Sequence, residues 1–63
     1  MREKLTPLEH AMLEIIKNNP NADRLGIAIK YGDIAGGYEK INSLEKKGYI
    51  STHGLVTINI ALL

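Results

Sequence analysis

The spacing of apolar residues changes along the chain from a helical period to a strand period. Between residues 7 and 18, apolar side chains recur three and four positions apart, which is the stripe of a helix buried along one face. After Gly48 the spacing falls to two, which is typical of a half-buried strand. The pattern therefore predicts helices through most of the chain and a β-hairpin after them. The first stripe consists of Leu8, Ala11, Met12, Ile15 and Ile16.

The start of the first helix carries a specific capping signal. Thr6 and Glu9 match a capping box, in which each side chain accepts a hydrogen bond from the backbone N–H of the other residue. Pro7 suits the first helical position, because the N–H that proline lacks would have no partner there. Asn19 and Pro20 break the pattern. These signals predict a helix over residues 7–18.

Two further helices follow from caps and glycines. Asp23 suits the N-cap of a helix over residues 24–31, and Gly32 can adopt the left-handed conformation that ends it. The third helix begins either early, capped by Asp33, or later, if the glycines at 36 and 37 delay it. We place it at 36–47, because its apolar spacing is clear from Tyr38 onward.

The hairpin is predicted over residues 49–60. His53 and Gly54 form a turn signal between two runs with strand-like alternation. An isolated two-stranded ribbon is marginally stable, so the apolar face formed by Val56, Ile58 and Ile60 must pack on the helices. All elements then share one core in a single domain spanning residues 1–63. The predicted core consists of Leu8, Met12, Ile15, Ile16, Ala28, Ile29, Ile41, Leu44, Ile50, Val56 and Ile58.

Composition narrows the function classes. The 63 residues include no cysteine, so neither a disulfide nor a thiolate metal site can form, which fits a cytoplasmic protein. No apolar run approaches the roughly 20 residues of a membrane span, and we expect neither a signal peptide nor a membrane partner. His10 and His53 lack partners at ligand spacing, and no nucleophile has a base arranged around it. We therefore expect no enzyme, cofactor or metal.

Several positions match the pattern of one DNA-binding family. Ala28 stands where two helices must cross closely, and Gly32 stands in the turn between them. Tyr38 and Ile41 match the two buried positions of a recognition helix. Residues 44–50 match the junction into a first wing strand. In these features the chain resembles the winged helix-turn-helix DNA-binding domains of small transcription regulators.

The resemblance covers residues 6–60 and carries expectations of fold and function. It implies a mainly α fold with a small β-hairpin, in which three helices precede a two-stranded wing. It also implies transcription regulation, with duplex DNA as partner and the third helix in the major groove. The residues expected to contact DNA are Lys30, Gly36, Tyr38, Glu39, Lys40, Asn42, Ser43, Lys46, Lys47 and His53.

Charge favours a second interpretation. The formal net charge is only +1, whereas DNA-binding domains usually carry a clear basic excess. Glu39 would repel phosphate, and the turn around His53 holds no lysine or arginine. Asp33 also stands where the family usually has an apolar residue. The alternatives are a winged helix that contacts another protein without reading DNA, and an ordinary solvated face for the lysines.

The last residues of the sequence suggest an oligomer. Leu62 and Leu63 are apolar, and a domain of this size gains stability from area buried in a dimer. We expect these two leucines either to form a homodimer contact or to pack over the first helix.

Overall fold

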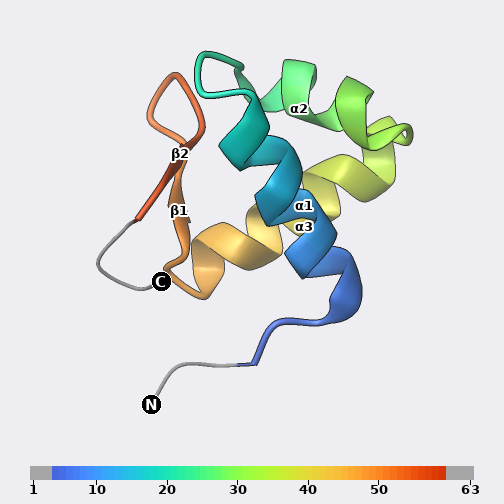
Figure 1. Cartoon of the computed structure of the whole chain (residues 1–63), viewed down its shortest axis with the longest axis vertical. Helices are drawn as coiled ribbons and strands as arrows, with labels where there is room; N and C mark the ends of the chain where they lie inside the picture. The colour runs from blue at the N-terminus through green and yellow to red at the C-terminus, as the bar shows by residue number, and fades with distance from the viewer. Residues whose placement is uncertain (1–3, 60–63) are drawn as a thin grey trace.

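The fold is mainly helical, with three helices followed by a two-stranded antiparallel sheet, as the pattern predicted. The structure, a computed structural model, describes residues 4–59. The first two helices, α1 (Pro7–Asn18) and α2 (Arg24–Tyr31), have the predicted bounds (Figure 1). The third helix, α3 (Ile34–Lys46), precedes the strands β1 (Ile50–Ser51) and β2 (Thr57–Ile58), which pair Ile50 with Ile58 and Ser51 with Thr57.

The caps predicted for α1 and α2 are present. The Thr6 hydroxyl accepts a hydrogen bond from the Glu9 N–H at 3.2 Å, and the Thr6 N–H donates to Glu9 Oε1 at 2.8 Å. Asp23 accepts from the Gly26 N–H at 2.8 Å. Gly32 ends α2 in the left-handed conformation, with φ at 96°. Side-chain hydrogen bonds therefore fix the starts of the first two helices, and the left-handed glycine fixes the end of α2.

The third helix starts two residues earlier than predicted, at Ile34. Asp33 is its N-cap residue by backbone conformation, but its side chain makes no capping hydrogen bond. Gly36 and Gly37 lie inside the helix and do not delay its start. The glycine at 37 has a packing role, because a Cβ placed there would lie 2.8 Å from the Ala28 Cα and 2.9 Å from its Cβ. Helices α2 and α3 thus cross with their backbones almost in contact.

Backbone hydrogen bonds tie the sheet to the connection between α1 and α2. Asp23 forms an isolated antiparallel bridge with Leu55, and the Val56 N–H donates to the Ala22 carbonyl at 3.1 Å. The paired strands are shorter than the predicted hairpin, and the turn between them includes Gly54 with φ at 86°. The chain after residue 51 therefore reaches back to the start of α2 before it pairs with β1.

The buried core differs from the predicted one in three ways. Two predicted residues are exposed, and Ile15 and Ile58 are only partly buried. Leu13, Ile27 and Tyr49 are buried although they were not predicted.

Leu8 is 53% exposed and Ile29 is 58% exposed, although both were expected inside. The buried stripe of α1 is shifted by one residue toward the C-terminus from the predicted stripe. It consists of Glu9, Met12, Leu13 and Ile16. In α2, contact with α3 runs through Ala28, which places Ile29 on the outer side. The buried hydrophobic residues are Met12, Leu13, Ile16, Ile27, Ala28, Ile41, Leu44, Tyr49, Ile50 and Val56.

No helix within residues 4–59 combines the length and the apolar character that crossing a membrane requires.

Two isoleucines provide a matched test of this core. We expect Ile41→Ala to lower the free energy of unfolding by about 2–5 kcal/mol, because Ile41 is fully buried and the substitution leaves a cavity. Ile29→Ala removes the same atoms from an exposed site and should cost less than about 1 kcal/mol. Urea unfolding of the two variants measures both values. Equal losses would contradict the orientation of α2.

The crossing of α2 and α3 gives a second test. Replacing an interior helical glycine by alanine ordinarily stabilises a helix by about 1 kcal/mol. Gly37→Ala should instead destabilise the protein by about 1–3 kcal/mol, because the new methyl group meets the Ala28 backbone and forces the helices apart. Thermal unfolding provides the measurement. A rise in melting temperature for this variant would show that the two helices are not in close contact.

Candidate nucleic-acid interface

One face of α3 is uncovered along the whole helix. Ala35, Glu39, Asn42 and Lys46 are all exposed, and their spacing places them on one side of the helix. We call these four residues the outer stripe of α3. The opposite side is buried through Gly37, Ile41 and Leu44. The outer stripe carries one cation, one anion and one amide, so its charge is balanced.

The other predicted contact residues lie in different settings, away from the outer stripe or only partly exposed. Lys40 and Gly36 are partly buried on α3, and Tyr38 packs against the hydrophobic core. His53 is exposed in the turn between the strands, and Lys30 is exposed near the end of α2. The structure therefore brings only part of the predicted set onto one open face.

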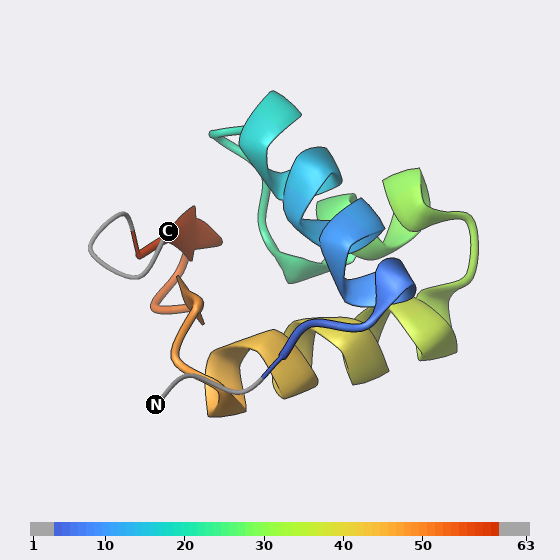
Figure 2. The ribbon, with the colours of Figure 1, turned by 60° about the horizontal axis from the view of Figure 1, so that its bottom comes forward.

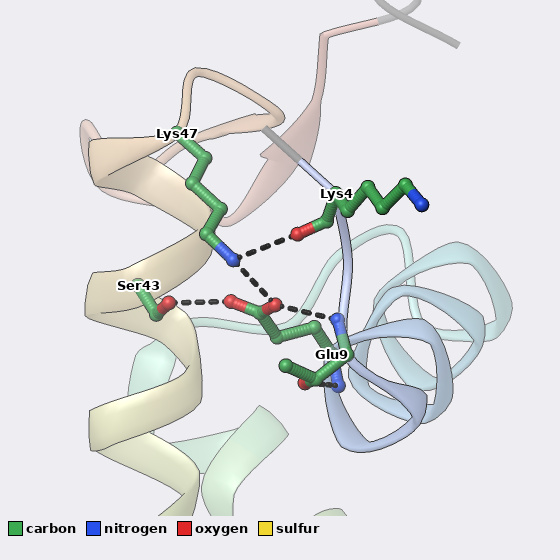
Figure 3. Close-up of polar contacts among 5 residues, drawn as sticks. Lys4, Glu9, Ser43 and Lys47 are labelled. Atoms are coloured by element: carbon green, nitrogen blue, oxygen red, sulfur yellow. Dashed lines mark hydrogen bonds and ion pairs between the residues drawn. The ribbon is translucent and has the colours of Figure 1, made fainter. Parts of the chain in front are cut away.

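Ser43 and Lys47 face into the molecule, toward Glu9 of α1. The Lys47 ammonium lies 2.7 Å from Glu9 Oε1 and also donates to the Lys4 carbonyl at 3.1 Å (Figure 3). The Ser43 hydroxyl donates to Glu9 Oε2. Two residues expected to contact DNA thus bind a carboxylate of their own chain. Through the Lys4 contact, this network also holds the segment before α1 alongside α3 (Figure 2).

Glu9 is the only buried charged residue within residues 4–59, at 2% exposure. Burial by itself raises the pKa of this carboxyl group. Hydrogen bonds from Lys47, Ser43 and the Thr6 N–H, together with the Lys47 charge, outweigh burial and lower the pKa from 4.5 to about 2. Glu9 is therefore ionised at neutral pH, and its two oxygens receive three different donors.

The burial of Glu9 could have been predicted from its position in the sequence, although a search for apolar spacing overlooks a charged residue. Glu9 was assigned only to the cap of α1, yet it stands three, four and seven positions before Met12, Leu13 and Ile16. Those intervals put it on the same helical face as the core residues. An acidic residue at such a position requires a cation and hydrogen-bond donors from another element, because an unpaired charge there would be too costly.

A hydrogen bond between α3 and the turn fixes part of the surface beside the outer stripe. The Thr52 hydroxyl donates to Glu45 Oε2 at 2.5 Å. Glu45 lies in the last turn of α3, and Thr52 directly precedes His53. The turn is therefore attached to the end of α3 through a side chain as well as through the intervening chain.

Across residues 4–59, no group of three histidine, cysteine, aspartate or glutamate side chains is arranged to hold a metal ion. The chain has no significant match among protein-family models, curated proteins or solved structures.

The lowered pKa of Glu9 predicts a stability change in acid. A carboxyl group with a lower pKa in the folded protein than in the unfolded chain stabilises the fold when the pH is above the unfolded pKa. This stabilisation is lost as the pH falls through the pKa of the folded protein. Between pH 4.5 and 2, protonation of Glu9 should lower the free energy of unfolding by about 3 kcal/mol. Carbon NMR of the Glu9 carboxyl group measures its pKa directly, and urea unfolding across this range measures the loss.

Two variants isolate this contribution. Ser43→Ala removes one donor, so it should raise the Glu9 pKa and shrink the acid-dependent loss while leaving the protein folded. Glu14→Gln, which changes an exposed carboxylate on the same helix, should leave the Glu9 titration in place. A Glu9 carboxyl group that titrates near 4.5 would show that the network with Lys47 does not form in solution.

Proposed function

We propose that this chain is a small winged-helix domain that binds duplex DNA with α3 in the major groove and serves as a transcription regulator. The observation that carries the proposal is the outer stripe of α3, which is exposed along the whole helix. The major groove of B-DNA admits one α-helix, and a helix can enter it only if one full face is free. The close crossing of α2 beneath this helix supports a helix-turn-helix arrangement.

The connections around the sheet support the winged form of this arrangement. β1 and β2 directly follow α3, and the turn between them is held to the last turn of α3 through Thr52 and Glu45. The bridge between Asp23 and Leu55 fixes the other side of this turn to the start of α2. In this proposal the turn serves as the wing and meets the DNA backbone, while α3 serves as the recognition helix.

The side chains of the outer stripe divide into two roles in this proposal. The Asn42 amide can make paired hydrogen bonds to an adenine edge, which gives sequence discrimination. Lys46 can bind phosphates, which gives affinity without sequence choice. Lys40 is partly buried on another side of α3 and Lys30 lies on α2, so neither belongs to the outer stripe. Glu39 opposes phosphate binding. Because Ser43 and Lys47 are bound to Glu9, we assign them to the fold and leave them out of the contact set.

This balance of charges implies weak binding by one domain. Useful affinity then requires two domains on half-sites one helical turn apart, roughly 34–36 Å. The predicted homodimer would supply such a pair. The leucines assigned to that contact, Leu62 and Leu63, lie outside the described residues.

Titration of duplex DNA with isotope-labelled protein tests the proposal. At about 50 mM salt we expect NMR shifts concentrated on the outer stripe and the turn at residues 52–55. Lys46→Ala should weaken binding on every sequence and reduce the slope of log affinity against log salt by about 1. Asn42→Ala should reduce discrimination between sites by about 1–3 kcal/mol.

Lys17→Ala is the matched control, because it removes an exposed lysine from the last turn of α1 without touching the outer stripe. It should leave the DNA affinity nearly unchanged. Absence of binding at low salt, or an equal loss for Lys17→Ala and Lys46→Ala, would contradict the assignment of α3 as the recognition helix.

A further inference from the structure

The carboxylate of Glu39 lies in the outer stripe of α3 without a partner. Of the two glutamates in α3, Glu45 accepts a hydrogen bond from the Thr52 hydroxyl, whereas Glu39 forms no hydrogen bond or ion pair within residues 4–59. No lysine or arginine stands three or four positions from Glu39, where a cation on the same helix would neutralise it. If this carboxylate met only phosphates, it would weaken DNA binding at the centre of the contact face.

Asn42 lies close to Glu39 on the same exposed face. Its amide also forms no hydrogen bond within the described part of the chain. The two residues are three positions apart, which is about 4.5 Å along a helix axis. Successive base pairs of B-DNA are about 3.4 Å apart. Two side chains with this spacing, on a helix that lies in the major groove, can reach neighbouring base pairs.

The edges of the four bases determine which of them a carboxylate can meet. An ionised carboxylate only accepts hydrogen bonds. In the major groove cytosine presents an amino donor at N4, whereas guanine presents two acceptors and thymine presents an acceptor and a methyl group. Adenine presents a donor beside an acceptor at N7, a pair of groups that suits an amide and repels a carboxylate. A carboxylate is therefore matched by cytosine, and an amide is matched by adenine.

We propose that Glu39 is a specificity-determining residue that accepts a hydrogen bond from N4 of a cytosine, next to an adenine bound by Asn42. This assignment rests on the proposed function, because it concerns the bases that α3 reads. The recognised element is a C·G pair beside an A·T pair. At the other bases the carboxylate meets acceptors, and along the DNA backbone it meets phosphates. Glu39 thus lowers the affinity for unmatched DNA more than the affinity for the matched site.

Selection from a pool of duplexes with a randomised central segment tests the assignment on the full chain. At about 50 mM salt we expect the recovered duplexes to share a C·G pair next to an A·T pair. In titrations of duplexes that differ only at the selected cytosine, cytosine should be preferred by about tenfold. NMR shifts on the outer stripe, measured with the selected duplex, locate the binding on α3.

Glu39→Gln replaces the carboxylate by an amide of nearly the same shape on an exposed site. It should change the preferred base at this position from cytosine to adenine, because glutamine pairs with adenine N6 and N7. It should also raise the affinity for duplexes without the motif, because a negative charge is removed. Glu14→Gln is the matched control, since it makes the same exchange on an exposed residue of α1 and should leave the base preference unchanged.

The outcomes separate this assignment from the proposed function. If duplexes shift the outer stripe without a preference for cytosine, or if Glu39→Gln keeps that preference, the assignment is overturned while DNA binding by α3 stands. An equal change of base preference in Glu14→Gln overturns the assignment as well. If no duplex binds at low salt, or if binding lies away from α3, both proposals are overturned.

Discussion

The packing of α1 on α3 depends on a carboxylate that has been taken out of water. Glu9 begins the buried stripe of α1, and its partners come from the far end of α3 and from the segment before α1. A buried charge is tolerable only when every oxygen has a donor and an opposite charge lies close. The same group also caps α1, so the position of that helix and its first turn are fixed by one side chain. In a chain of this length the apolar core alone provides little stability, so removing one partner of this buried pair would be strongly destabilising.

The elements and their caps could be predicted from the sequence because the signals are local. Thr6, Asp23 and Gly32 act on backbone groups within four residues, and each does so in the structure. The direction in which a helix faces is set by its neighbours and was predicted less well. Leu8 and Ile29 satisfy a hydrophobic stripe by spacing, yet the contacts with Glu9 and Ala28 turn them outward. The start of α3 was misplaced because Gly36 and Gly37 were interpreted as a break, whereas one of them makes room for α2.

In the candidate site, too, the local features were predicted and the contacts between distant residues were not. The sequence indicated an exposed face on α3, and Glu39, Asn42 and Lys46 are found there. It did not separate these residues from Ser43 and Lys47, because that separation depends on an acid far away in the sequence. The exposure of Ile29 on α2 was also missed, since spacing had assigned this residue to the interior. The exposure of Leu8 and Ile29 and the burial of Glu9 have the same cause, which is the rotation of each helix about its own axis.

The hydrogen bond from the Val56 N–H to the Ala22 carbonyl has a consequence for the cooperativity of unfolding. It closes a long loop that encloses α2, α3 and β1, and the chain entropy lost in closing that loop must be recovered by the contacts within it and between its ends. The contacts of Glu9 with Ser43 and Lys47 close a second loop of similar length that overlaps the first. Early and late parts of the described chain therefore hold each other in place and form one cooperative unit.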